Sequence, residues 1–257
     1  MAAPLELSRL VASLGTLARR FDIDLLESCD STNAVLLQRA EAGAPSGSVV
    51  VAQEQSAGRG RRGRAWLSAP GDSLTFSLLW RFAPATAPAG LSLAVGLAVA
   101  QGIEQSGGTT IRLKWPNDLL LDGRKLGGIL VELVPGAPHA AVIGIGLNLR
   151  LPDGMPDELR EQSAALGAAC EPNELLAALL TELLEVLELF GRQGFAALHP
   201  QWRARDAYAD APVRLLSDFA PPRDGICRGA DGDGALLFES GGRVERILSG
   251  EVSLRKS

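Results

Sequence analysis

Four arginines and three glycines alternate in one short segment of this sequence, Gly58-Arg59-Gly60-Arg61-Arg62-Gly63-Arg64. Glycines let backbone N–H groups approach a phosphate closely, while arginine side chains neutralise its charge. The segment also matches the G-x-G-x-x-G dinucleotide pattern, but that pattern requires a helix directly after it, and here Ser68-Ala69-Pro70-Gly71 follows. We therefore predict a flexible nucleotide clamp outside a Rossmann fold, with a solvated basic loop or an RNA contact as alternatives.

A second polar segment, Lys114-Trp115-Pro116-Asn117-Asp118, combines a lysine with two turn-forming side chains. Pro116 favours an extended residue before it, so Lys114 ends a strand and Asn117 and Asp118 form the turn that follows. These two side chains are suited to an adenine or a hydrated Mg²⁺. A plain hairpin corner with an Asn-Asp turn is the alternative.

Only three of the 25 basic residues are lysines, and Lys125 begins the segment Lys125-Leu126-Gly127-Gly128-Ile129. A compact ammonium group fits where a planar guanidinium group does not, so an interior lysine indicates a specific contact. Paired glycines in a strand mark the close approach of a ligand or another backbone, and Gly144-Ile145-Gly146 repeats the pattern. The two segments predict a slot for a flat, mostly apolar molecule with Lys125 at its charged end; a bulge or plain packing is the alternative.

The hydrophobic pattern supplies the elements that must position these segments. Amphipathic helices are predicted over 4–20 and over 172–190, the latter ending at Gly191. N-cap residues at 30–33 begin a short helix that Gly43 ends, and a helix over 93–106 is apolar almost all round. Strands are predicted at 49–52, 74–78, 111–115, 119–121, 129–134 and 141–149. They form a mostly antiparallel sheet covered by helices, an α+β fold.

Beyond Trp202 the sequence changes to short strands separated by turns, at 213–216, 225–228, 235–239, 243–248 and 251–254. Such a run is consistent with a small β-barrel. We therefore predict a large domain over residues 1–208 and a small barrel over 209–257.

Composition limits the classes of partner. The chain has 257 residues and a formal charge of −5, which argues against a surface that binds nucleic acid or anionic lipid throughout. Its three cysteines share no C-x-x-C spacing, so neither a disulfide framework nor a zinc knuckle is indicated. The sequence has no secretion signal and no apolar run near the roughly 20 residues that span a bilayer. We expect a cytoplasmic protein that does not bind membranes.

Five segments resemble those of biotin protein ligases in order and spacing: 30–33, 58–66, 114–118, 125–130 and 144–148. The resemblance extends from about Leu25 to Arg255 and includes Gly250-Glu251-Val252-Ser253-Leu254-Arg255. It implies a central domain related to class II aminoacyl-tRNA synthetases, followed by an SH3-like barrel. It also implies the short form, without the N-terminal winged helix by which some family members repress transcription.

This resemblance implies a reaction: biotin and ATP, with Mg²⁺, form biotinyl-5′-AMP, and the biotinyl group then passes to one lysine of a carboxyl-carrier domain. The implied acceptor is the biotin carboxyl carrier protein of acetyl-CoA carboxylase, with no DNA partner and a monomer or homodimer as the functional unit. A lipoate–protein ligase that also forms an acyl-adenylate is the alternative enzyme. A nucleic-acid-binding repressor is the alternative from another class.

The resemblance also assigns residues to roles. Lys125 and Arg61 are implied to be catalytic, and Asp118 is implied to bind the metal. The implied biotin-binding residues are Ser31, Thr32, Asn33, Gln55, Arg59, Gly60, Arg61, Lys125, Gly128, Gly144 and Gly146. The implied nucleotide-binding residues are Arg59, Arg61, Arg62, Arg64, Trp66, Lys114, Asn117, Asp118 and Asn148. The segment around Met155 to Ala165 matches the family poorly, and no contact is predicted there.

Overall fold

The computed structural model describes residues 5–107, 109–167, 170–217, 220–248 and 252–256. Seven strands form a mixed sheet in the order β1-β2-β3-β7-β6-β5-β4. Their bounds are β1 (Asp22–Cys29), β2 (Ser48–Gln55), β3 (Ser73–Arg81), β4 (Arg112–Lys114), β5 (Asp118–Leu121), β6 (Arg124–Val134) and β7 (Ala137–Asn148). Only β1 and β2 run parallel; the other neighbouring pairs in this sheet run antiparallel. The predicted α+β fold with a mostly antiparallel sheet is confirmed.

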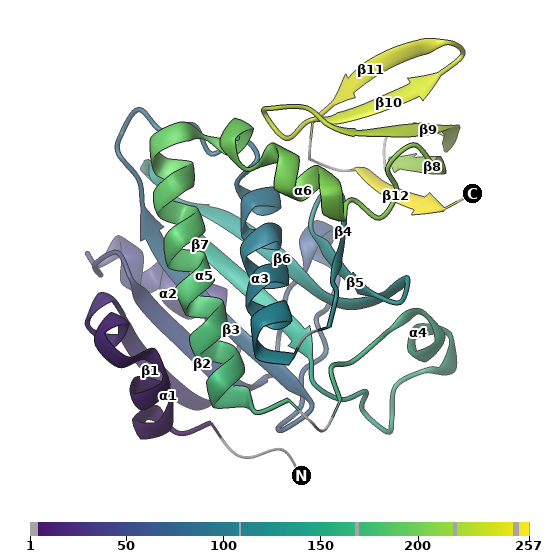
Figure 1. The fold of residues 1–257 in the computed structure, drawn as a ribbon. Coiled ribbons are helices and arrows are strands. Elements are labelled where there is room, and N and C mark those ends of the chain that lie inside the picture. The colour runs from purple at the N-terminus through teal and green to yellow at the C-terminus, as the bar shows by residue number, and fades with distance from the viewer. Residues whose placement is uncertain (1–4, 108, 168–169, 218–219, 249–251, 257) are drawn as a thin grey trace.

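Helices cover both faces of this sheet (Figure 1). On one face α3 (Leu91–Gly107) and α5 (Pro172–Gln193) pack against each other, and α1 (Leu7–Leu14) packs against α5. On the other face α2 (Thr32–Glu41) packs against β2 and β3. Val49 and Val51 of β2 join the larger hydrophobic cluster, while Val50 between them joins the cluster beneath α2. Burial on both faces explains why the central strands are apolar throughout instead of alternating.

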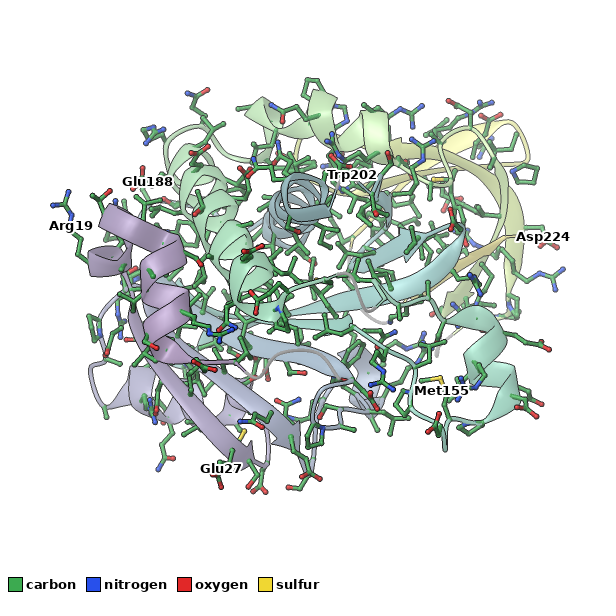
Figure 2. All side chains as sticks on the ribbon, turned by 60° about the horizontal axis from the view of Figure 1, so that its bottom comes forward. Arg19, Glu27, Met155, Glu188, Trp202 and Asp224 are labelled. Atoms are coloured by element: carbon green, nitrogen blue, oxygen red, sulfur yellow. The ribbon has the colours of Figure 1, made fainter. Side chains whose placement is uncertain are left out.

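A second sheet, antiparallel and five-stranded, lies beyond α6 (His199–Arg205) and β4 (Figure 1). Its strands are β8 (Pro212–Ser217), β9 (Arg223–Ala230), β10 (Leu236–Ser240), β11 (Arg243–Ile247) and β12 (Val252–Lys256). Gly250 and Glu251, which the sequence comparison includes, lie outside the described residues. Phe238 of this sheet and Trp202 of α6 belong to the same buried cluster as the large domain, and Trp202 points into the interior in Figure 2.

Several elements differ from the sequence-based prediction, and helices α4 and α6 were not predicted. The first α-helix ends at Leu14, because Gly15 turns the backbone to a φ of 55° and a 3₁₀ helix (Gly15–Arg20) follows. Strand β1 was not predicted, since its buried and exposed residues do not alternate. Helix α5 continues through Gly191 to Gln193 and ends at Gly194, where φ is 69°.

In the part of the chain that the structure describes, no helix combines the length and hydropathy needed to cross a membrane.

Candidate active site

One cavity of about 550 Å³ gathers every site residue that the sequence analysis named. Its wall is built by the start of α2, the end of β2, the arginine-rich segment 58–64 (hereafter the arginine loop), the turn before β5, and the glycine-containing parts of β6 and β7. The five sequence segments therefore converge on one place, although up to about a hundred residues separate them along the chain.

A hydrogen-bonded group of buried side chains, which we call the polar corner, lies where α2 begins. The backbone N–H of Thr32 donates to Gln55 Oε1 at 2.7 Å. The Thr32 and Ser77 hydroxyl oxygens lie 2.7 Å apart, and Ser77 Oγ lies 2.5 Å from Asn33 Oδ1. Thr32, Asn33, Gln55 and Ser77 form the polar corner, and all four are buried. A small ligand with an amide-like group would meet fixed donors and acceptors there.

Ser31 occupies the N-cap position of α2 but does not cap the helix with its side chain. It is buried and lines the cavity together with Thr32 and Asn33. The predicted N-cap residues therefore lie at the helix start, but their side chains line the cavity.

A carboxylate bridged by two ammonium groups forms the charged end of the cavity. Asp118 Oδ2 lies 2.7 Å from Lys114 Nζ, and Asp118 Oδ1 lies 2.7 Å from Lys125 Nζ. Burial by itself would raise the pKa of Asp118, but the Lys125 and Lys114 charges hold that pKa at about 2. Burial lowers the pKa of Lys114, and Asp118 counteracts it. The Lys114 side chain is 8% exposed and that of Lys125 is 43% exposed, so Lys125 is the ammonium group that a ligand can reach.

The arginine loop forms a compact turn over the cavity. The N–H of Gly60 donates to the carbonyl oxygen of Arg64 at 2.7 Å, and the N–H of Trp66 donates to that of Gly58 at 2.9 Å. Arg62, with a φ of 60°, adopts the left-handed conformation inside the turn. Arg61 Nη1 donates to Asn117 Oδ1 at 3.3 Å, which connects the loop to the turn before β5. Burial lowers the pKa of the Arg61 guanidinium group, and the nearby Asp118 charge opposes this.

The glycines of β6 and β7 line the cavity, but protein side chains take up much of the space above them. A Cβ atom on Gly144 would lie 2.3 Å from Asn33 Oδ1, and one on Gly146 would lie 2.5 Å from Trp66 Cε2. A Cβ atom on Gly128 would lie 3.5 Å from Lys125 Nζ. In this structure the side chains of Asn33, Trp66 and Lys125 approach these glycines, and the slot for a flat ligand stays a prediction.

Two buried polar atoms on the cavity wall, Trp66 Nε1 and Thr75 Oγ1, have no hydrogen-bond partner among the described residues. A buried donor or acceptor without a partner is costly, so such atoms in a cavity wall indicate where a polar ligand atom fits. Sequence reasoning missed Thr75 because one threonine in a buried strand carries no pattern of its own.

The polar side chains that sequence reasoning assigned to the nucleotide have further structural contacts. Asn117 donates through Nδ2 to the carbonyl oxygen of Ile129 at 2.8 Å. Asn148 donates to the carbonyl oxygen of Ala164 at 3.0 Å and so holds the segment after β7 against the cavity. That segment includes Met155, which Figure 2 places beside α4 (Asp157–Gln162).

Sequence reasoning also missed residues that reach the cavity from the end of the chain and from α4. Tyr208, the only tyrosine, and Arg255 of β12 line the cavity beside the bridged carboxylate. Leu159 of α4 lines it with half of its surface exposed. No short motif marks these positions. Tyr208 reaches the site from the segment between α6 and β8, and Arg255 reaches it from β12.

Asp118 is the residue that the resemblance assigns to a metal ion. Both carboxylate oxygens are already paired with ammonium groups, and the described residues contain no cluster of three or more His, Cys, Asp or Glu side chains. In this structure Asp118 is the partner of two lysines, and its role as a metal ligand stays a prediction.

Comparisons with known proteins decide the family. Residues 25–148 match the biotin/lipoate A/B protein ligase family. A biotin–[acetyl-CoA-carboxylase] ligase from Paracoccus denitrificans is 34% identical over 241 residues, which are 89% of this chain and 98% of that protein. The chain belongs to the biotin protein ligase family.

Other members of the biotin protein ligase family support this membership. The bifunctional ligase/repressor BirA of Salmonella typhimurium is 40% identical over 242 residues, which cover 92% of this chain and 75% of that protein. The structure of the biotin protein ligase from Aquifex aeolicus in complex with biotin and ATP superposes with a TM-score of 0.79 at 29% identity. The superposition covers 92% of this chain and 99% of the Aquifex chain, so the likeness includes the C-terminal sheet.

Proposed function

We propose that this protein joins biotin to AMP at the expense of ATP and transfers the biotinyl group to a lysine of a biotin carboxyl carrier protein. One observation carries the proposal: the polar corner and the cations around Asp118 open into a single cavity. An uncharged ring with N–H and C=O groups fits one end of that cavity, and a carboxylate beside a phosphate fits the other.

The first step brings two anions together. An oxygen of the biotin carboxylate attacks the α-phosphorus of ATP, the bond from that phosphorus to pyrophosphate breaks, and a mixed anhydride forms. Repulsion between the carboxylate and the phosphate must be screened, and fixed cations in a partly buried site screen it without reorganising. Lys125 and Arg61 are in reach of the cavity, and we assign them this catalytic role. Each such contact contributes about 2 to 4 kcal/mol of transition-state stabilisation.

In the second step the amine of the acceptor lysine attacks the carbonyl carbon of the mixed anhydride. AMP departs with the bonding electrons, the amine loses a proton, and an amide results. The arginine loop keeps water away from the anhydride between the two steps, because it folds over the cavity and is anchored to Asn117 through Arg61.

We assign the ureido end of biotin to Ser31, Thr32, Asn33 and Gln55, with Arg59, Gly60, Gly128, Gly144 and Gly146 around the rest of the molecule. The nucleotide is assigned to Arg59, Arg61, Arg62, Arg64, Trp66, Lys114, Asn117, Asp118 and Asn148. Trp66 Nε1 is a free donor for it in the cavity wall. ATP is used with Mg²⁺, and Asp118 is the residue that we assign to the metal.

We also propose the domain boundaries, the acceptor, the cellular location and the oligomeric state. The catalytic ligase domain is residues 1–208 and the SH3-like barrel is residues 209–257. The acceptor is the carrier protein of acetyl-CoA carboxylase, the protein acts in the cytoplasm, and it acts as a monomer or homodimer without binding DNA.

Thermal unfolding with biotin alone, with ATP and Mg²⁺, and with all three together tests the proposal. A tightly held product of both substrates raises the melting temperature far more than either substrate, because stabilisation grows with the logarithm of ligand concentration over Kd. Pyrophosphate release with biotin against lipoate separates the two candidate ligases. Turnover with lipoate alone would assign this chain to the lipoate branch of the matched family.

A further inference from the structure

The cavity carries an excess of positive charge, although the formal charge of the chain is −5. Eight basic residues line it against two acidic ones, Asp118 and Glu161, and Asp118 is already paired with two lysines. Magnesium-bound ATP brings compensating charge, but once pyrophosphate has left, biotinyl-AMP keeps only the charge of its one phosphate. Cations at the mouth of the cavity are therefore open to a second anionic partner during the transfer step.

Two cavity-lining arginines, Arg124 of β6 and Arg255 of β12, have no role in the proposed function. Both are exposed, so they lie at the mouth of the cavity, and neither forms an ion pair with a residue that the structure describes. By contrast, the exposed Arg39 of α2 has a carboxylate partner, Asp24, at 2.6 Å. The guanidinium groups of Arg124 and Arg255 are therefore available to carboxylates from another molecule.

Two leucines with large exposed surfaces lie at the same mouth. Leu67, which follows the arginine loop, is 52% exposed, Leu159 of α4 is 47% exposed, and both line the cavity. A phosphate gains nothing from an exposed leucine, whereas protein interfaces combine apolar contacts with polar groups around them. The mouth therefore fits a protein surface better than a further phosphate group. Leu67, Arg124, Leu159 and Arg255 together are hereafter the docking rim.

We propose that the docking rim binds the acceptor protein, and that it recognises a surface on which carboxylates and an apolar side chain surround the target lysine. The carboxylates pair with Arg124 and Arg255 while the target amine enters the cavity. Without them, the ammonium group of an approaching lysine would be repelled by the cationic mouth. Attraction between opposite charges also accelerates the encounter. This inference rests on the proposed function and adds to it the chemistry of the acceptor surface.

Synthetic biotinyl-5′-AMP, supplied to the protein, separates the transfer step from the use of ATP. The acceptor probe is the apo biotin carboxyl carrier domain of an acetyl-CoA carboxylase, and hydroxylamine serves as a small acceptor that is uncharged at neutral pH. Arg124→Glu and Arg255→Glu should each lower kcat/KM for the carrier domain by about tenfold at low salt, because repulsion replaces attraction. The rate with hydroxylamine should stay within about threefold of that of the parent, because an uncharged acceptor is not steered.

Matched substitutions control for charge and for apolar surface. Arg243→Glu on β11 changes an exposed arginine outside the cavity lining and should leave transfer to the carrier domain unchanged. Leu159→Ser should lower this transfer by about fivefold at every salt concentration, because the lost contact is apolar. Its control is Leu133→Ser, at a residue that is 44% exposed and outside the cavity lining.

Salt and a reversed acceptor test the charge pairing directly. The kcat/KM of the parent for the carrier domain should fall by about tenfold between roughly 0.05 and 0.5 M salt, because ions screen exposed charges. The double variant Arg124→Glu/Arg255→Glu should show no such fall. A carrier domain in which arginines replace the carboxylates nearest to the target lysine should be a poor acceptor for the parent and a better one for Arg124→Glu.

Different results would overturn different statements. If Arg124→Glu and Arg255→Glu raise KM for ATP and leave transfer from supplied biotinyl-AMP unchanged, these arginines bind phosphate and the inference is wrong. It is also wrong if the rates with hydroxylamine and with the carrier domain fall by the same factor, or if transfer by the parent does not depend on salt. A parent that neither releases pyrophosphate with biotin nor uses supplied biotinyl-AMP would contradict the proposed function itself. A parent that does both, with variants that behave like it, would contradict the docking inference alone.

Discussion

The ammonium group of Lys125 lies 2.7 Å from one oxygen of Asp118, at the charged end of the cavity. Lys114 pairs with the other oxygen and is buried, so Asp118 holds Lys125 in place while Lys125 remains exposed on its other side. The carboxylate therefore orients a cation toward the place where charge develops in the reaction.

Replacing Lys125 by Ala should lower biotin-dependent pyrophosphate release by about 30- to 1000-fold, because one fixed cation at the reacting phosphate is lost. The matched control is Arg19→Ala, an exposed basic residue outside the cavity lining, which should retain most of the activity. If the rate of Lys125→Ala stays within threefold of that of the parent, Lys125 is not catalytic.

Asp118→Asn should make the protein less stable, because Lys114 then stays buried without a counter-charge. The folded-state pKa of Asp118, about 2, is lower than its ordinary value, so its contribution is complete above about pH 4 and is lost as the pH falls toward 2. Urea unfolding of parent and variant should give a constant gap from pH 7 to 5 that closes between pH 4 and 2. A gap that widened in acid would contradict this sign.

Arg61→Gly should weaken retention of biotinyl-AMP more than its formation, since the hydrogen bond from Arg61 to Asn117 holds the arginine loop over the cavity. The released anhydride would then label lysines of bystander proteins. Retention is measured by the half-life of the complex after gel filtration, with the exposed Arg19→Gly, on the periphery in Figure 2, as the control. Equal half-lives for the parent and Arg61→Gly would refute the closing role.

Gly146→Ala should displace the Trp66 ring, because the added Cβ would lie 2.5 Å from Cε2. We expect KM for ATP to rise by about tenfold or more, with a smaller effect on biotin, since Trp66 is assigned to the nucleotide. Gly107→Ala at the end of α3 adds the same atom where nothing lies within 4 Å, and it should leave both constants unchanged. Unchanged KM values for Gly146→Ala would show that the ring does not contact nucleotide.

Tyr208→Phe should raise KM for ATP by about tenfold, the effect of one lost hydrogen bond to a charged group, and leave the Kd for biotin unchanged. Burial raises the pKa of Tyr208, with Arg255 and Asp118 acting on it in opposite directions, so the hydroxyl stays protonated and can donate to a phosphate. Because phenylalanine keeps the ring, the melting temperature serves as the control. If biotin affinity fell by the same factor, the Tyr208 hydroxyl would not act on ATP alone and this prediction would be wrong.

The sequence predicted the residues at the cavity more accurately than it predicted the peripheral strand β1 and the end of helix α5. Local patterns with a physical cause, such as the arginine loop, the Asn-Asp turn and the paired glycines, all lie at the cavity. Edge strand β1 was missed because a strand with one neighbour in its sheet needs no alternation of apolar residues. The prediction ended helix α5 at Gly191. A glycine can remain helical, however, and the helix ends three residues later at Gly194, where the backbone turns.

The contacts that could not be predicted are those that depend on tertiary placement. The sequence neighbours of Asp118 do not reveal that two lysines reach it from different strands. Glu132 and Ser77 lie on strands β6 and β3, and only the folded sheet and α2 bring them to Asn33.

The C-terminal sheet shares its hydrophobic cluster with the ligase domain, and the buried Trp115 indole donates to the Gly234 carbonyl oxygen at 3.1 Å. Arg255 of β12 reaches the cavity from this sheet. Cutting the protein at residue 208 would therefore expose the apolar side chains of α6 and β4 to water and remove part of the cavity wall at once. Such a truncated chain should aggregate rather than survive as a weaker enzyme, and the two sheets should melt in one transition.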